Sequence, residues 1–368
     1  MKILCSQRDL DNALNVVNKA INPNNTLPVL NNVLISAKDG KLHFGATNLE
    51  IAISCSIDAE VKKEGAITVP AKLITNYVAL LNDEKVEMEL TDSLNLLIDS
   101  SSSKTKIKCI SAEEFPIIPQ IEKENYLNVN IDHFISAINQ TVFAASVNTS
   151  RPVLSGVYMM LEGNKLKLAS TDSYRLAERK IDVASTTVSE LECIVPARTM
   201  SELAKIISKS EEKEVRLDIS KNQILFSVGG IELISRLIEG KFPDYRKIIP
   251  VEEKTRFEVS VEDLSLTLKR VSLFARENNN SVFLNVGEDG RLLVSSEETK
   301  LGEEKSSLLV KIQGIPNKIS LNAQYLLDVL NFINDDKIDI IINDKESPAL
   351  VKTIKQDDYI YIIMPLKV

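Results

Sequence analysis

The chain repeats one order of helices and strands three times, and corresponding landmarks return every roughly 120 to 130 residues. Each pass opens with an amphipathic helix, continues through strands joined by tight turns, and carries a second helix that follows a strand. A period of this length marks a repeat of whole domains rather than a short solenoid unit. The 368 residues suffice for two to three domains with separate cores. We therefore predict an α+β protein of three repeated domains, each with antiparallel strands and two helices, over residues 1–120, 121–250 and 251–368.

The first repeat shows the pattern in full. Apolar residues in 8–21 fall on one helical face, and Pro23 ends that helix. Strands joined by an Asp39-Gly40 hairpin turn follow, and Pro70 introduces a second helix that runs through Leu81. Further strands are predicted at 85–90, 94–99 and 104–110.

The second and third repeats keep this order. Hairpin turns are predicted at Gly163-Asn164 and Asp289-Gly290. Ser260, with Asp263 three residues later, forms a capping-box pattern at the start of a helix. The helices predicted in these two repeats cover 132–145, 199–209, 262–276 and 324–333.

One stretch of the middle repeat, A-S-T-D-S-Y-R-L-A at 169–177, combines apolar and polar handles. It indicates the end of one strand, a turn at Asp172-Ser173 and the start of the next strand. No nucleophile stands beside a base here, so we interpret the stretch as part of a binding surface. Residues 46–49 and 295–298 take its place in the other two repeats, which lack an equivalent.

Catalytic and cofactor-binding patterns are absent from the sequence. It contains no phosphate-binding glycine loop, nucleophile elbow, zinc-protease motif or dinucleotide fingerprint. The two histidines and the four scattered cysteines fit neither a metal site nor a disulfide framework, and they favour a reducing cytoplasm. The apolar runs are too short to span a bilayer, and charge at Arg8 argues against a signal peptide. We predict a cytoplasmic protein with no cofactor, no metal and no membrane partner.

The charge distribution bears on how two copies of the chain pair. The net charge of −8 argues weakly against a simple nucleic-acid binder, although an acidic total does not exclude a basic face. Three similar domains suggest rotational pseudo-symmetry, in which two arcs close a ring. Opposite charges at the two ends favour head-to-tail pairing, and two unrelated solvated faces are an equal alternative. The residues assigned to this interface are Lys104, Lys106, Ile107, Leu273, Phe274, Glu297, Glu298, Glu303 and Glu304.

Eight motifs, spread in order over the whole chain, resemble those of the bacterial DNA polymerase III beta subunit, the sliding clamp. Each motif alone is weak, but the series is specific in a chain of this length with three repeats. The motifs are T-L-P-V-L at 26–30, V-P-A-K at 69–72, R-P-V-L-S-G at 151–156, S-T-D-S-Y-R-L-A at 170–177, V-P-A-R at 195–198, E-G-K-F-P-D-Y-R at 239–246, Y-L-L-D-V-L at 325–330 and Y-I-I-M-P-L-K-V at 361–368.

The resemblance implies a head-to-tail homodimeric ring of six domains, whose helices line a central hole around duplex DNA. It implies a non-catalytic processivity factor that tethers the replicative polymerase alpha subunit and other clamp-binding-motif proteins of replication and repair. It also implies a separate, ATP-driven clamp loader, since the chain carries no nucleotide-binding motif.

The partner-binding pocket of that family maps onto the last two repeats. Apolar residues such as Leu154 and Met364 would form its floor. The donors at its rim for an extended peptide would be Arg175, Arg246, Lys247 and Asn322. A peptide with a Gln and a Leu or Phe end would bury one or two anchors and bind with micromolar affinity, roughly −8 kcal/mol. The mapped residues are Val153, Leu154, Thr171, Ser173, Tyr174, Arg175, Leu176, Pro243, Arg246, Lys247, Ile248, Asn322, Tyr325, Ile362, Met364, Pro365 and Leu366.

DNA contact by a sliding ring is predicted to be non-specific, because bonds to bases would hold it in place. Lys72 and Arg198 are the better candidates, since they recur after Pro70 and Pro196. Each cation on its own is also typical of an ordinary solvated helix face. The candidates are Arg8, Lys19, Lys72, Arg151, Arg198, Lys205, Lys209, Lys269 and Arg276.

Two departures from the family pattern are visible. Ser173-Tyr174 replaces the usual Gly-His, and serine tolerates a positive φ less well than glycine. We expect a turn of altered shape and a pocket that is kept. The loop Asn22-Pro23-Asn24-Asn25 stands where some relatives carry arginine, which puts a DNA contact there in question.

Two other functions stay open at this point. One is an enzyme built on a triplicated α+β domain, with Asp172, Tyr174 and Arg175 as its site. The absence of His, Cys and metal constellations weighs against it. The other is a protein-only scaffold that never touches DNA.

Overall fold

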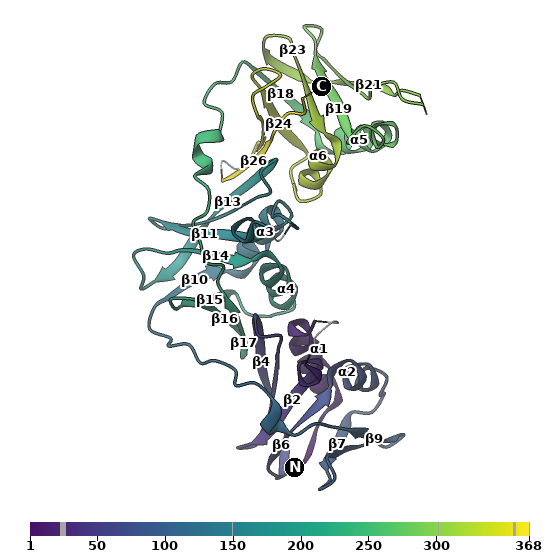
Figure 1. Ribbon diagram of the computed structural model, residues 1–368, viewed down its shortest axis with the longest axis vertical. Coiled ribbons are helices and arrows are strands. Elements are labelled where there is room, and N and C mark those ends of the chain that lie inside the picture. The colour runs from purple at the N-terminus through teal and green to yellow at the C-terminus, as the bar shows by residue number, and fades with distance from the viewer. Residues whose placement is uncertain (23–26, 149, 301, 356–357, 368) are drawn as a thin grey trace. The chain divides into compact units, whose positions relative to one another are not determined.

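The computed structural model describes residues 1–22, 27–148, 150–300, 302–355 and 358–367 (Figure 1). The predicted helix end at Pro23, the loop through Asn25 and the start of the motif at Thr26 lie outside these residues. Within them, the fold consists of antiparallel strands and six α-helices. The helices are α1 (Gln7–Val17), α2 (Ala71–Ala79), α3 (Ile131–Val142), α4 (Ala197–Ile207), α5 (Val261–Ala275) and α6 (Ala323–Leu330).

Each predicted helix is present, with ends that differ by a few residues. The helix expected over 8–21 ends at Val17 and tightens into a 3₁₀ turn, η1 (Asn18–Ala20), as helix ends often do. The predicted cap is confirmed, because the Ser260 hydroxyl accepts a hydrogen bond from the Asp263 amide at 3.2 Å. The paired helices α1 and α2 pack against each other, as do α5 and α6.

The described chain divides into two compact units. The first comprises 1–131, 184–188 and 205–237. It contains a five-stranded sheet of order β5-β1-β7-β8-β9 and a second sheet of order β6-β2-β3-β4-β17-β16-β15-β10. Its strands are β1 (Lys2–Ser6), β2 (Asn32–Lys38), β3 (Lys41–Thr47), β4 (Ile51–Asp58), β5 (Glu60–Lys63), β6 (Gly65–Pro70), β7 (Lys85–Leu90), β8 (Asn95–Asp99), β9 (Lys104–Lys108), β10 (Tyr126–Asn130), β15 (Glu214–Ile219), β16 (Gln223–Val228) and β17 (Ile231–Arg236).

The second unit comprises 132–183, 189–204 and 238–368. It contains a sheet of order β14-β11-β12-β13-β26-β25-β24-β18-β22 and a four-stranded sheet of order β21-β20-β19-β23. Its strands are β11 (Gly156–Glu162), β12 (Lys165–Thr171), β13 (Arg175–Thr186), β14 (Glu192–Pro196), β18 (Thr255–Ser260), β19 (Ser281–Val286), β20 (Arg291–Ser295), β21 (Lys305–Leu309), β22 (Lys311–Gly314), β23 (Asn317–Asn322), β24 (Lys337–Ile342), β25 (Ala349–Thr353) and β26 (Tyr359–Ile363).

The larger sheet of each unit contains strands from two sequence repeats. In the first unit, β4 pairs antiparallel with β17, and in the second, β13 pairs antiparallel with β26. The middle repeat is therefore divided, with some of its strands in the first unit and the others in the second. The division at residues 120 and 250 stays a prediction about sequence repeats, which these compact units do not follow.

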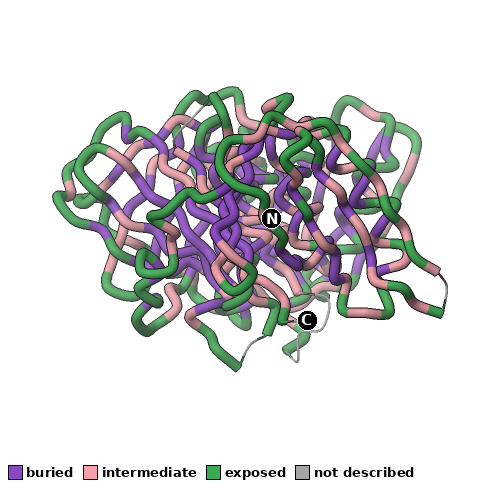
Figure 2. The backbone as a smooth tube through the Cα atoms, turned by 90° about the horizontal axis from the view of Figure 1, so that it is seen from above, coloured by how far each residue is buried: buried purple, intermediate pink, exposed green. Residues whose placement is uncertain are grey.

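The cores form where helix faces meet alternating strand residues, as the buried segments in Figure 2 illustrate. In the third repeat, Leu264, Leu268 and Val271 are fully buried at the four- and three-residue spacing of one helical face. Val282 and Leu284, two residues apart on β19, belong to the same core. These periodicities explain why the sequence alone places the helices and strands.

One prediction about the repeats is wrong. Residues 47–51 fold into the same turn as residues 171–175, although the first repeat was expected to lack an equivalent. In both turns the threonine hydroxyl donates to the carbonyl of the last residue, and the following Asn or Asp side chain accepts from two backbone amides. The third residues, Leu49 and Ser173, both have positive φ, at 75° and 82°. The two turns are therefore alike in their hydrogen bonds, although different residues form them.

Candidate functional site

The turn between β12 and β13 is fixed by its own side chains. The Asp172 carboxylate accepts hydrogen bonds from the amides of Tyr174 and Arg175 at 2.9 and 3.0 Å. The Thr171 hydroxyl donates to the Arg175 carbonyl at 2.6 Å. Ser173 sits at the tip with a positive φ, which is uncommon for a residue with a Cβ. Tyr174 is consequently turned outward and is 63% exposed.

Arg175 braces this turn against two helices. Its guanidinium donates to the Asp172 and Asp328 carboxylates and, at 2.7 Å, to the Phe143 carbonyl, and it lies 4.5 Å from the centre of the Tyr325 ring. Burial opposes its charge, but Tyr361 and the two carboxylates more than offset that effect, so its pKa is raised. Sequence reasoning expected Arg175 as an open rim donor, whereas the structure commits it to holding the turn.

The C-terminal tail is anchored to the same turn. β26 pairs with β13 along Arg175–Arg179, and the next amide, that of Met364, donates to the Tyr174 carbonyl at 2.8 Å. Two residues later the Leu366 amide donates to the Ser320 carbonyl at 2.9 Å. The segment Met364–Lys367 therefore runs from the turn to β23 with its side chains only partly buried or exposed.

The connection that follows β17 lies against β11 and β13. Gly240 has a φ of 130°, and a Cβ there would lie 2.6 Å from the Val153 side chain, so only glycine suits this approach. Phe242 stacks on Tyr158 with ring centres 4.8 Å apart. The buried Tyr245 hydroxyl donates to the Glu178 carboxylate. These contacts leave the predicted residues Pro243, Arg246, Lys247 and Ile248 exposed.

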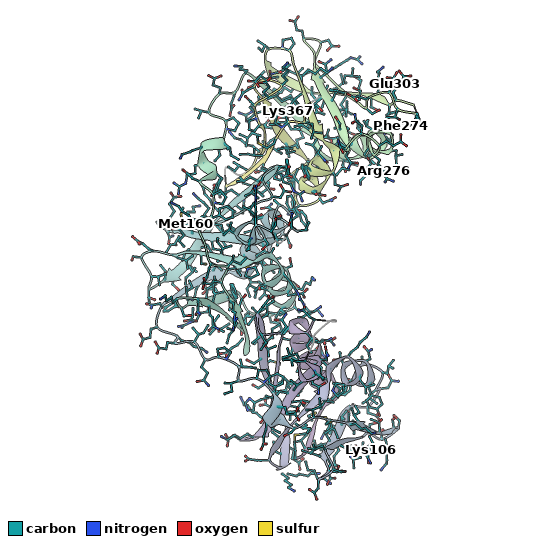
Figure 3. The ribbon with its side chains drawn as sticks, viewed as in Figure 1. Lys106, Met160, Phe274, Arg276, Glu303 and Lys367 are labelled. Atoms are coloured by element: carbon teal, nitrogen blue, oxygen red, sulfur yellow. The ribbon has the colours of Figure 1, made fainter. Side chains whose placement is uncertain are left out.

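The tail forms one wall of a cavity of about 890 Å³. Met364, Pro365 and Leu366 line it, and the other fourteen residues predicted for the pocket do not. Sequence reasoning missed the other lining residues. One signal was available, because Phe283 lies between the core residues Val282 and Leu284 and must therefore face outward from β19. The missed lining residues are Phe283, Lys318, Ile319, Ser320, Lys345, Glu346 and Lys367, the last of which is labelled in Figure 3.

Other residues predicted for the pocket are buried in the core or cap a helix. Leu176 and Ile362 face each other in the β13–β26 pairing and have no exposed surface, as part of one buried cluster. Leu154 is also buried. The Asn322 side chain caps α6 by accepting from the Gln324 and Tyr325 amides. Ligand contact by these four residues stays a prediction.

Comparison with known proteins identifies the arrangement. Family models of the DNA polymerase III beta subunit match the N-terminal domain over 1–119, the central domain over 128–244 and the C-terminal domain over 246–367. This chain belongs to that family. It is 31% identical to the beta sliding clamp of Synechococcus elongatus, covering 100% of this chain and 99% of that protein. It is 30% identical to the beta sliding clamp of Staphylococcus epidermidis, covering 97% and 96%.

Solved structures agree. The sliding clamp of Bacillus subtilis matches with a TM-score of 0.95 at 28% identity, covering 100% of this chain and 99% of that one. The beta subunit of Thermotoga maritima matches with a TM-score of 0.94 at 27% identity and the same coverage. The predicted resemblance and the α+β fold of three clamp domains are confirmed. The chain is a sliding clamp, the non-catalytic processivity subunit of DNA polymerase III.

The DNA-contact candidates of this clamp are mostly exposed helix residues. Arg8, Lys72, Lys205 and Lys269 lie on helices with exposed side chains. Arg198 is exposed on α4, Lys209 and Arg276 are exposed just beyond helix ends, and Lys19 is partly buried in η1. Arg151 differs, because its guanidinium donates to the Ser173 hydroxyl at 3.3 Å and so contacts the turn between β12 and β13.

The interface candidates lie at two strand edges. Lys104 pairs with Asp99 at 2.6 Å and Glu303 with Lys305 at 2.7 Å, so both have partners within the chain. Glu304 accepts from Ser306, and Glu297 accepts from Asn278. Ile107 is buried, whereas Lys106 and Glu298 are exposed. Leu273 is 55% exposed at the end of α5, and Phe274 lies 3.7 Å from where a Cβ of Gly302 would stand. Figure 3 shows Phe274 and Glu303 in the same region of the second unit.

Arg175→Lys should lower the free energy of unfolding of the second unit by about 2 kcal/mol, because lysine cannot reach Asp172, Asp328 and the Phe143 carbonyl together. Arg246→Lys is the matched control at a side chain that is 58% exposed, and its effect should stay within about 0.5 kcal/mol. Urea unfolding measures both. Equal midpoints for the two variants would contradict the bracing role.

Proposed function

We propose that two copies of this clamp close head to tail into a ring around duplex DNA and hold the replicative polymerase on its template. The observation that carries the proposal is a pair of edge strands, one in each unit, that hold the same kind of position in their sheets as the strands joined at the junctions within the chain. β9 ends the five-stranded sheet, and β21 ends the four-stranded sheet.

The two junctions between repeats within the chain indicate how these edge strands would pair. At both junctions, the last strand of one repeat's sheet pairs antiparallel with the last strand of a sheet from the next repeat. By the same rule, β9 of one copy pairs with β21 of the second copy. Two such contacts close a two-fold ring, and they cover edges that would otherwise invite uncontrolled pairing.

Side chains near the two edges support this pairing. Leu273 and Leu309 are 55% and 81% exposed and offer apolar surface to a partner. Lys106 on β9 and Glu298 before β21 provide opposite charges. Lys104, Glu303 and Glu304 would have to exchange their partners within the chain to contribute.

The exposed helix cations suit a ring that slides. Lysine and arginine bind phosphates without reading sequence, so contact persists as the ring moves along the duplex. The candidates are Arg8, Lys19, Lys72, Arg151, Arg198, Lys205, Lys209, Lys269 and Arg276. The proposed compartment is the cytoplasm, where chromosomal DNA is replicated. Among the described residues, none of the helices has the length and apolarity that a bilayer crossing requires.

The pocket beside the tail is the proposed docking site for partners. Its ligands would be short extended peptides of the polymerase alpha subunit, the clamp loader and other clamp-binding-motif proteins. The tail supplies an apolar wall through Met364 and Leu366, and Arg246 and Lys247 supply exposed donors. The sliding clamp of Pseudomonas aeruginosa, 25% identical, has been solved with griselimycin bound, so that clamp binds a ligand other than DNA.

An enzymatic site around Asp172, Tyr174 and Arg175 finds no support. The carboxylate and the guanidinium are engaged with each other and with the turn backbone. Burial raises the pKa of the Cys5, Cys55 and Cys193 thiols to about 12, which leaves them unreactive at neutral pH. In the described part of the chain, no group of three or more His, Cys, Asp or Glu side chains is placed to hold a metal ion.

Ring closure predicts that the clamp, loaded onto nicked circular DNA by its clamp loader and ATP, stays there and is lost when that DNA is linearised, because a ring slides off free ends. Gel filtration of the loaded DNA measures the retained protein. Blocking both ends of the linear DNA with a bulky bound protein should restore retention. Persistence on unblocked linear DNA would contradict a topological link, and absence of any retention on circles would favour the protein-only scaffold.

Deleting Met364–Val368 should weaken binding of a fluorescein-labelled pentapeptide that begins with Gln and ends in Leu-Phe by at least about tenfold. The tail wall would be lost, together with its bonds to Tyr174 and Ser320. Fluorescence anisotropy measures the affinity, and Lys367→Ala is the control that keeps the apolar wall. Unchanged affinity in the deletion variant would place the peptide elsewhere.

A further inference from the structure

The first unit contains a second copy of the frame that anchors the tail to the turn at 171–175. There the Arg236 amide donates to the Glu50 carbonyl at 2.9 Å, just as the Met364 amide donates to the Tyr174 carbonyl at 2.8 Å. Ser235 pairs with Ile51 at the end of the β4–β17 ladder. The turn at 47–51 has the same hydrogen bonds as the turn at 171–175. It also has a residue of positive φ at its tip. Arg236 therefore occupies the place of Met364.

A small cavity opens beside this frame. Its volume is about 80 Å³, and its walls come from the turn, from the segment after η3 (Ala112–Glu114), and from β16 and β17. Leu49, Pro116, Ile117 and Ile234 give it a largely aliphatic lining. Leu49 is 47% exposed and Ile117 is 95% exposed, so both present apolar surface to solvent at the mouth.

The size of the cavity selects its occupant. A dry cavity of about 150 Å³ holds a benzene ring, so a space of about 80 Å³ takes one branched aliphatic side chain and excludes an aromatic ring. The proposed pocket beside the tail is about 890 Å³ and accepts larger anchors. The two sites would therefore read different side chains from the same kind of extended backbone.

The rim charge adds a second requirement. Arg236 is exposed. Among the described residues, no carboxylate forms an ion pair with its guanidinium. Gln223, its neighbour across the β16–β17 ladder, adds an amide to the same wall. A carboxylate close to the aliphatic anchor would pair with Arg236 in a charge-assisted hydrogen bond. Glu50, whose carbonyl accepts from the Arg236 amide, also lines the cavity and disfavours a second acidic group there.

We propose that this cavity is a second peptide-docking site of the clamp, specific for an extended segment with one Leu-sized aliphatic side chain followed by an acidic residue. The site depends on the proposed function only in the kind of ligand it takes, a partner's linear segment. With it, one chain can hold two different partner segments, and neither competes for the other's anchor.

A photo-crosslinking experiment on the full-length protein tests the site. The probe is the acetylated pentapeptide Gln-Ala-Leu-Asp-Ala, with a diazirine analogue of leucine at its centre. Irradiation followed by proteolysis and mass spectrometry should place adducts on the segments that carry Leu49 or Ile117, and excess unlabelled peptide should remove them. Adducts on the Met364 segment are scored separately, so the main pocket and this site succeed or fail independently.

Charge reversal supplies the decisive variants. Arg236→Glu should reduce labelling of the Leu49 and Ile117 segments about tenfold, as expected for a lost hot-spot arginine, while a probe with Lys in place of Asp should restore it. Lys221→Glu, an exposed charge reversal outside the cavity lining, is the matched control and should change nothing. Labelling confined to the Met364 segment, labelling unchanged in Arg236→Glu, or crosslinks from this cavity to a second copy of the chain would each overturn the proposal.

Discussion

Antiparallel pairing between strands of successive repeats is the constraint on which the rest of this clamp depends. The β4–β17 and β13–β26 ladders each extend a sheet from one repeat into the next. Backbone hydrogen bonds carry these junctions, so they require extended strands with the correct register rather than particular side chains. The same chemistry leaves β9 and β21 as open edges. Repetition of one junction therefore accounts for both the continuity of the chain and its proposed closure into a ring.

The proposed partner site lies where such a junction ends. Beyond the last β13–β26 pair, the chain has one more amide to satisfy, and the carbonyl at the Tyr174 turn accepts it. Arg175 holds that turn in place through two carboxylates and a helix-terminal carbonyl. The tail is thereby presented as a wall beside a cavity. Asp172, Arg175 and Asp328 are engaged with one another and with the turn backbone, so these charged residues hold the turn in place.

Much of the fold follows from the sequence, because local periodicity and capping decide it. The buried apolar face of α5 and the Ser260 cap can both be predicted from the sequence. The ladders between repeats are not, since β4 and β17 lie far apart in sequence and any strand edge can pair with another. The equivalence of the two turns was missed because Thr-Asn-Leu-Glu and Thr-Asp-Ser-Tyr share only a hydroxyl and a side-chain acceptor. For the site, the tail was predicted, whereas the bracing role of Arg175 depends on two hydrogen-bond partners distant in the chain, Asp328 and Phe143.

Residue-resolved amide hydrogen exchange at Arg236 and Met364 tests most directly whether the two junctions are built alike. Both amides close a ladder onto a turn carbonyl. They should exchange as slowly as the neighbouring strand amides of Ser235 and Ile363, and far more slowly than that of the exposed Gln120. Slow exchange at both positions would support one repeated junction as the basis of this clamp. Exchange at either position as fast as at Gln120 would contradict it.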